Sequence, residues 1–207
     1  MTTSLGMLIV GFDYSGVASD EFHDWYDNEH IPERKAVPGF LTAQRWLGAG
    51  IQTLSVAIYD LENLQVLQGE AYRCIAGDNF SPWSKRVIGK CRTVCRFEAE
   101  QVYPGNQLSS SVADFAVLIA TTSTEHMHSP KSMAGALDLP GLVGTRGFKT
   151  RDGSEVNLYE FCSTGIGSEK LVGILANARL PWIELTPSSP PVWSMLLRRY
   201  SRANAQR

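Results

Sequence analysis

The pattern of hydrophobic and polar positions divides the first half of the chain into six elements. A short apolar run and stretches that alternate with a period of two predict strands. Two stretches with apolar residues three and four positions apart predict helices, one beginning at Ser19 and one beginning at Leu61. The predicted strands are Met7–Phe12, Phe40–Leu47, Thr53–Tyr59 and Cys91–Glu98. The predicted order is therefore strand, helix, strand, strand, helix, strand.

The second half repeats this order after a stretch rich in Pro, Gly and Ser. That stretch, YPGNQLSSS, begins at Tyr103 and predicts a linker. Capped helices are predicted near Ser129 and from Ser168. The predicted strands are Phe115–Ala120, Leu142–Thr150, Val156–Cys162 and Val192–Tyr200. A faint internal repeat supports the division, because LPGLVGTRGF follows VPGFLTAQRW at a distance of 102 residues.

These elements predict an α+β protein made of two tandem ferredoxin-like βαββαβ units. Residues 1–102 form the first unit, residues 103–112 the linker and residues 113–207 a degenerate second unit. Each unit is expected to form a four-stranded antiparallel sheet with both helices on one face. The open face of each sheet needs a cover, which the other unit can supply. The predicted fold is therefore two antiparallel sheets packed face to face as a pseudo-dimeric α/β barrel.

The densest motif of the chain is EFHDWYDNEHIPERKAVPGFLTAQRW, which begins at Glu21. Helical spacing predicts a buried stripe made of Phe22, Trp25, Tyr26 and Glu29. His30 is expected beside this stripe. Pro32 lacks a backbone donor and restricts the residue before it, so the regular helix should end or kink there.

The motif resembles the dimeric α/β-barrel superfamily of ferredoxin-like domains and, within it, the EthD-like branch. The residues that carry the resemblance are Trp25, Tyr26, Glu29, His30, Ile31, Pro32, Val37, Pro38, Gly39 and Phe40. The resemblance implies that two units pack sheet against sheet around a cavity, here within one chain. The superfamily includes monooxygenases, isomerases, polyketide cyclases, dehydratases and heme-dependent enzymes, so the fold does not choose a reaction. Because the second half lacks the Trp-Tyr and Glu-His pairs, one site is expected near the first-half motif.

Composition and charge exclude several classes of function. The chain has 207 residues, 43% of them hydrophobic, and a formal net charge of -2, which gives no basic field for nucleic acid. It shows no secretory signal and no apolar run long enough to span a membrane, so a cytoplasmic protein is expected. The four cysteines form no CxxC pair and are expected to be reduced. His126 and His128 lack a third ligand at a recognisable spacing, and no flavin or nicotinamide motif occurs, so neither metal nor cofactor is predicted.

Two residues are candidates for catalysis. His30 could act as a general acid or base near neutral pH, although a histidine near a helix C-terminus also satisfies free carbonyl groups. Glu29 is the second candidate, but a carboxylate on a buried stripe needs a partner. Pairing with Arg34, Arg45 or a backbone cap would make its role structural.

Six residues are candidates for substrate binding. They are Trp25, Tyr26, Arg45, Tyr59, Arg92 and Arg96. The two aromatic residues of the motif could line a pocket or fill the core, and Arg45 could shape the site. The last three residues lie on mixed strand faces, which could bind a carboxylate or enolate oxygen in the inter-sheet cavity or could face solvent.

These candidates predict a cofactor-independent enzyme that acts on a small apolar carbonyl or aromatic, polyketide-like compound. Proton transfer would occur at His30 in the inter-sheet cavity. One alternative is a non-catalytic small-molecule-binding or accessory protein that uses the same cavity. Another is a purely structural oligomer whose inter-sheet space is filled with side chains. The expected partners are a small-molecule ligand and, through edge strands, a second copy of the chain in a homodimer.

Overall fold

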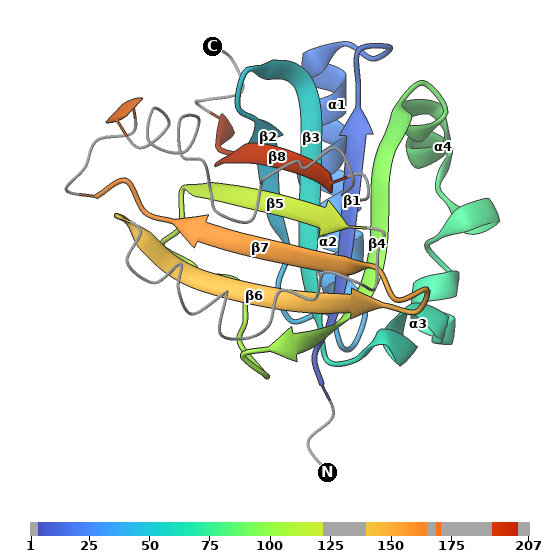
Figure 1. Ribbon diagram of the computed structural model, residues 1–207. Coiled ribbons are helices and arrows are strands. Elements are labelled where there is room, and N and C mark those ends of the chain that lie inside the picture. The colour runs from blue at the N-terminus through green and yellow to red at the C-terminus, as the bar shows by residue number, and fades with distance from the viewer. Residues whose placement is uncertain (1–3, 122–139, 165–168, 171–191, 203–207) are drawn as a thin grey trace.

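In a computed structural model that describes residues 4–121, 140–164, 169–170 and 192–202, eight strands form one closed barrel (Figure 1). All neighbouring strands pair antiparallel, in the order β1-β3-β2-β8-β5-β7-β6-β4. The strands are β1 (Gly6–Asp13), β2 (Gln44–Gly48), β3 (Ile51–Leu61), β4 (Arg92–Tyr103), β5 (Phe115–Thr121), β6 (Leu142–Thr150), β7 (Glu155–Phe161) and β8 (Val192–Arg199). Each overlaps a strand predicted from the sequence.

The expectation of a ferredoxin-like pseudo-dimer with two sheets packed face to face is wrong, because the two halves share one continuous barrel. Strand β2 pairs with β8 at Trp46 and Arg199, and β4 pairs with β6 at Ala99 and Thr150. These pairings join the edge strands of one half to the edge strands of the other. Backbone groups that two separate sheets would leave unpaired are therefore hydrogen-bonded, which favours closure.

Two apolar layers stabilise the described part of the barrel. Along β1, Met7 and Ile9 belong to the interior layer, while Leu8 and Phe12 belong to a layer beneath the helices. The interior layer also takes residues from the second half, including Phe148. Apolar side chains thus occupy the interior, where the sequence led us to expect a cavity between two sheets.

The helices with defined bounds come from the first half and lie outside the barrel (Figure 1). They are α1 (Ser19–Trp25), a π-helix (Tyr26–His30), α2 (Ile31–Ala36), a 3₁₀ helix (Leu64–Gln68), α3 (Glu70–Arg73), a second 3₁₀ helix (Gly77–Asn79) and α4 (Pro82–Ile88). Pro32 does not end the first helical segment, because it stands in the first turn of α2, where a missing N–H is tolerated. The segment around Trp83 is a helix that Ser81 caps by accepting a hydrogen bond from the N–H of Ser84.

The helices predicted near Ser129 and from Ser168 lie almost wholly outside the described residues, as do His126 and His128. The description of the second half therefore rests on its strands.

The predicted linker is tied to buried charges in the barrel. Arg146 donates from Nη1 to Asp60 Oδ1 at 2.6 Å, and its Nε lies 3.3 Å from Glu160 Oε2. The backbone N–H groups of Ser109 and Ser110 donate to Asp60 and Glu160 at 2.7 and 3.0 Å. The segment between β4 and β5 is thus bound to both halves of the barrel.

Candidate functional site

The motif helix contains a π-helix, which changes the face that each residue presents. Its turn is wider than that of an α-helix, so residues after Tyr26 are rotated relative to the α-helical spacing. His30 is consequently buried, and Glu29 is only partly buried at the margin. The predicted assignment of Glu29 to the stripe and His30 to its edge is therefore reversed.

Glu29 is hydrogen-bonded to two serines at the start of α4. Its Oε1 accepts hydrogen bonds from Ser81 Oγ at 2.6 Å and from Ser84 Oγ at 2.9 Å. These bonds join the motif helix to the start of α4. The partners of Glu29 are therefore two serine hydroxyls, and neither Arg34 nor Arg45 is paired with it.

His30 lies in the apolar layer between the helices and the barrel. Its ring is 4.5 Å from the ring of Trp25 and 5.1 Å from that of Tyr26, measured between centroids. Burial, with smaller effects from Arg34 and Arg45, lowers the pKa of His30 well below its ordinary value. Its Nδ1 has no hydrogen-bond partner among the described residues. His30 is thus a neutral imidazole inside the core.

The predicted aromatic residues are also buried. Trp25 donates from Nε1 to Ser84 Oγ at 3.0 Å. The hydroxyl groups of Tyr26 and Tyr59 have no hydrogen-bond partner of good geometry within the described chain, although each affects the pKa of the other. Burial raises the pKa of Tyr26 to about 12 and raises that of Tyr59 well above its ordinary value. These two residues pack beneath the helices.

The two predicted arginines of β4 lie on the surface. Arg92 is 73% exposed and pairs with Asp13 at 3.2 Å. Arg96 pairs with Glu98 at 2.6 Å and donates to the hydroxyl of Tyr72 at 3.3 Å. The structure therefore does not bring Arg92 and Arg96 together with the motif residues.

Arg45 is the predicted binding residue that the structure places at a pocket. Its Nη1 donates to Asp27 Oδ1 at 2.6 Å and its Nη2 donates to His23 Nδ1 at 2.8 Å. Its Cζ lies 4.1 Å from the ring centroid of Tyr26 and 3.8 Å from that of Tyr200. Two hydrogen bonds and two cation–π contacts hold this guanidinium group in one orientation.

Asp27 connects this arginine to the C-terminal residues of the described chain. Its Oδ2 accepts hydrogen bonds from the Tyr200 hydroxyl at 2.6 Å and from Arg202 Nη1 at 3.0 Å. Arg202 also pairs with Asp24. Burial and the hydrogen bond to Asp27 raise the pKa of Tyr200, so this phenol keeps its proton.

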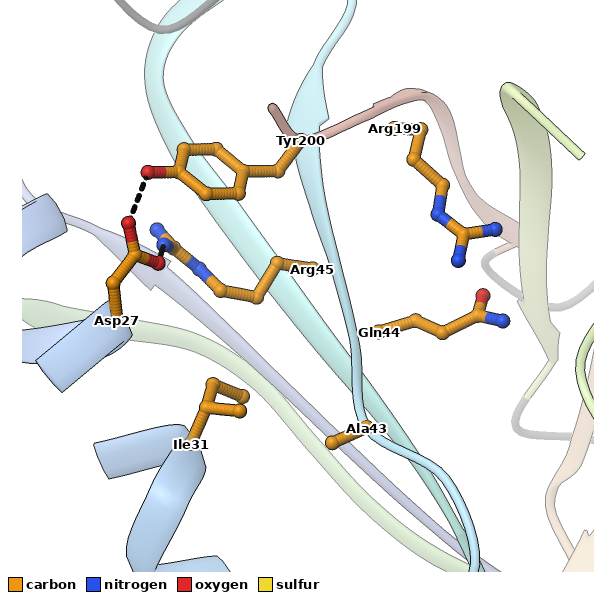
Figure 2. A pocket seen from close by; sticks show the side chains of 7 residues that line it. All are labelled: Asp27, Ile31, Ala43, Gln44, Arg45, Arg199 and Tyr200. Carbon is orange, nitrogen blue, oxygen red and sulfur yellow. Dashed lines mark hydrogen bonds and ion pairs between the residues drawn. The ribbon is translucent and has the colours of Figure 1, made fainter. Parts of the chain in front are cut away.

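A pocket of about 240 Å³ lies where β2 and β8 diverge, and we call it the seam pocket (Figure 2). The two strands pair from Gly48 and Leu197 to Trp46 and Arg199, and one more backbone bond joins Tyr200 N–H to the Arg45 carbonyl at 2.9 Å. The polar residues that line the pocket are Asp27, Gln44, Arg45, Arg199 and Tyr200. Ile31 and Ala43 add apolar surface.

The polar lining of the seam pocket comes from both faces of the barrel wall. Figure 2 shows Arg45 and Tyr200 pointing toward Asp27, whereas Gln44 and Arg199 point to the other side of β2. Gln44 Nε2 and Arg199 Nη1 each donate to the Ser110 carbonyl, at 3.1 and 3.0 Å. The linker and the ends of two strands thus hold side chains rich in N–H donors around a small space.

The described residues do not fit a heme, which some members of the resembled superfamily use. Heme iron is commonly held by an axial histidine. His23 and His30, the histidines within the described ranges, are packed against aromatic rings, and neither lines the seam pocket. The same ranges contain no group of three His, Cys, Asp or Glu residues that could hold a metal ion.

Sequence analysis found Arg45 but missed the residues around it. His23 and Asp27 are four positions apart on the motif helix, a spacing that could have predicted a polar pair. Gln44, Arg199 and Tyr200 gave no such signal, because they reach the pocket through the pairing of β2 with β8.

No family model matches the sequence, and no curated protein matches it. Solved structures do match. An anthrone oxidase-like protein has a TM-score of 0.55 at 10% identity and covers 95% of this chain and 92% of its own. A proposed monooxygenase from Lactobacillus acidophilus has a TM-score of 0.56 at 12% identity, and the match covers 95% of this chain and 94% of the monooxygenase. Chlorite dismutase from Candidatus Nitrospira defluvii, in complex with imidazole, has a TM-score of 0.56 at 9% identity, and the match covers 99% of this chain and 94% of the dismutase.

These three structures resemble this chain in fold over nearly its whole length. At such identities the likeness concerns the fold alone and assigns no reaction. Within the described residues, no helix is both long and apolar enough to cross a membrane.

Proposed function

We propose that this protein binds a small compound that carries a carbonyl or carboxylate oxygen and an apolar part, and that it does so in the seam pocket. The observation that carries the proposal is the position of Arg45 at the wall of a pocket of about 240 Å³. Two hydrogen bonds and two cation–π contacts fix its guanidinium group there. Fixed donors bind an oxygen at a lower entropic cost than mobile ones.

The other lining groups agree with such a ligand. Gln44 and Arg199 add N–H donors, while Ile31 and Ala43 offer surface for an apolar body. The volume of about 240 Å³ suits a compound smaller than a drug-sized ligand, because pockets for such ligands are typically larger than about 300 Å³. The names of the structural neighbours, which include an oxidase-like protein, a monooxygenase and a chlorite dismutase, favour a small molecule as the ligand.

The test is a binding assay with three probes of one size, namely acetophenone, benzoate and benzenesulfonate. Binding is measured by calorimetry and by ligand-observed NMR in the wild type and in Ala43→Trp, which fills the pocket. The matched control is Ala71→Trp on the exposed surface of α3. We expect Ala43→Trp to abolish binding and the control to leave it unchanged. Equal binding by both variants, or no binding of any probe, would contradict the proposal.

Proton-transfer catalysis by His30 is a second candidate function. The observation in its favour is the neutral imidazole of His30, whose Nδ1 lacks a partner within the described residues and could accept a proton. His30 does not line the seam pocket, so a substrate would need another approach or a movement of the motif helix. His30→Gln separates the two functions: it should retain binding in the seam pocket, and any turnover of a bound compound should disappear if His30 carries it.

A further inference from the structure

His23 stands directly behind the wall of the seam pocket and contacts two of its lining residues. Its Nδ1 accepts the hydrogen bond from Arg45 Nη2 at 2.8 Å. Its ring stacks on Tyr200, with centroids 5.1 Å apart and an angle of 26° between the ring planes. On the other side its Nε2 lies 3.5 Å from the hydroxyl of Tyr14, which itself donates to the Gln52 carbonyl at 2.8 Å. His23 therefore contacts both the arginine and the tyrosine of the pocket.

We infer that His23 is a positioning residue, which holds Arg45 and Tyr200 in the geometry for binding only while its Nδ1 is unprotonated. The inference rests on the proposed function of the seam pocket. An arginine has donors and no acceptor, so Nδ1 must offer a lone pair to receive the bond. A protonated imidazole would present an N–H and a positive charge to the guanidinium group. The bond would then be lost, and Arg45 would be held by fewer contacts, namely its bond to Asp27 and its packing on the rings of Tyr26 and Tyr200.

The charged and titratable groups around His23 come from four parts of the chain. They are Asp24 and Asp27 on its own helix, Arg45 on β2, Tyr14 after β1, and Tyr200 and Arg202 after β8. The two carboxylates favour a proton on His23, but each is already paired with an arginine. Burial and then Arg45 lower the pKa of His23 to about 4, so the neutral form prevails near pH 7.

The experiment uses the matched variants His23→Asn and His23→Leu, which branch in the same way at Cγ. The asparagine Oδ1 can accept from Arg45 and does not titrate, whereas leucine cannot accept at all. The probe is benzenesulfonate, whose charge stays constant over the pH range used. Binding to each purified full-length protein is measured by calorimetry from about pH 7 to about pH 3.5, within which His23 should titrate.

Near pH 7 we expect His23→Asn to bind within about threefold of the wild type and His23→Leu to bind about tenfold more weakly, the effect of losing one hydrogen bond to a charged group. On acidification, the wild type should lose about fourfold more affinity than His23→Asn by about pH 3.5, because only the neutral fraction is competent to bind. The other ionisable groups around His23 are the same in both proteins, so the comparison isolates His23. Equal binding by the Asn and Leu variants, or parallel pH profiles for the wild type and His23→Asn, would overturn the inference.

A second measurement keeps the two proposals distinct. If the wild type does not bind benzenesulfonate near pH 7, the proposed function fails for an anionic probe, and the role of His23 is decided by NMR titration of its Cε1–H signal. Arg45→Gln should then raise the pKa of His23 toward its ordinary value, while Arg92→Gln on the surface should leave it unchanged. An unaltered pKa in Arg45→Gln would show that the arginine does not hold His23 neutral.

Discussion

Replacing Arg146 with Met tests the buried charges that bind the linker to the barrel. Arg146 is fully buried and lies 2.6 Å from Asp60 and 3.3 Å from Glu160. It also donates to Ser109 Oγ in the linker at 2.8 Å. Methionine keeps most of the apolar stem and removes the charge, so two buried carboxylates are left without a cation.

Removal of one partner from a buried ion pair costs about 3–5 kcal/mol, because the remaining charge stays in an apolar interior. We therefore expect Arg146→Met to lose about 4 kcal/mol of unfolding free energy near pH 8. Burial raises the pKa of Glu160, and Arg146 opposes that rise. Without the arginine the pKa of Glu160 should rise further, so the fold favours its protonated form.

The sign of the pH dependence follows from this shift. A carboxyl group whose pKa is raised by folding contributes stability below its unfolded value of 4.5, and this contribution is lost as the pH rises through the folded value. The difference in unfolding free energy between Arg146→Met and the wild type should therefore be largest near pH 8 and smaller near pH 5.

The assay is urea unfolding followed by tryptophan fluorescence at about pH 5 and about pH 8, where the extrapolated free energies are compared. The control is Arg92→Met, which removes an exposed pair and should cost less than about 1 kcal/mol. Equal losses of unfolding free energy in both variants, or a loss in Arg146→Met as large near pH 5 as near pH 8, would show that Arg146 does not stabilise the buried carboxylates.

Three further predictions concern single side chains near the motif. Tyr59→Phe removes a buried hydroxyl that has no hydrogen bond of good geometry among the described residues, so thermal unfolding should show a stability within about 0.5 kcal/mol of the wild type or higher; a loss above about 1 kcal/mol would show that its contact with the Tyr26 hydroxyl stabilises the fold. Glu29→Ala should cost about 1–2 kcal/mol in urea unfolding, because it removes the acceptor shared by two serines of α4, and Ser81→Ala should reproduce part of that loss. Gly39→Ala should destabilise the protein by at least about 1 kcal/mol, since the backbone φ is +92° and the new Cβ would lie 2.5 Å from Val66 Cγ2; an unchanged melting temperature would show that the turn relaxes.

The strands could be predicted from the sequence because their pattern is local. Thr53–Tyr59 alternates between apolar and polar residues and lies within β3. Cys91–Glu98 also alternates, and it overlaps the N-terminal part of β4. The closure of the barrel could not be predicted in this way. Pairing of β2 with β8 joins residues about 150 positions apart, and no period in the sequence specifies it.

The candidate site was predicted in part, and the reason lies in one turn of helix. The sequence indicated a site near the motif and selected Arg45, which the structure places at the seam pocket. It ranked His30 first because α-helical spacing puts that residue at the edge of a buried stripe. The π-helix rotates His30 into the core, and His23, about two turns earlier, is the histidine that contacts Arg45.

The position of the pocket follows from the way the barrel closes. Strand β2 is only five residues long, and its pairing with β8 extends to Trp46, beyond which one backbone bond joins Tyr200 N–H to the Arg45 carbonyl. In place of a strand, the Ser110 carbonyl of the linker accepts the bond from Gln44, and the chain after β8 turns toward the motif helix, where Tyr200 and Arg202 reach Asp27. The first half thus supplies the arginine and the carboxylate, and the second half supplies the tyrosine that covers them. A site of this kind needs both halves of the chain, even though only the first half carries the motif.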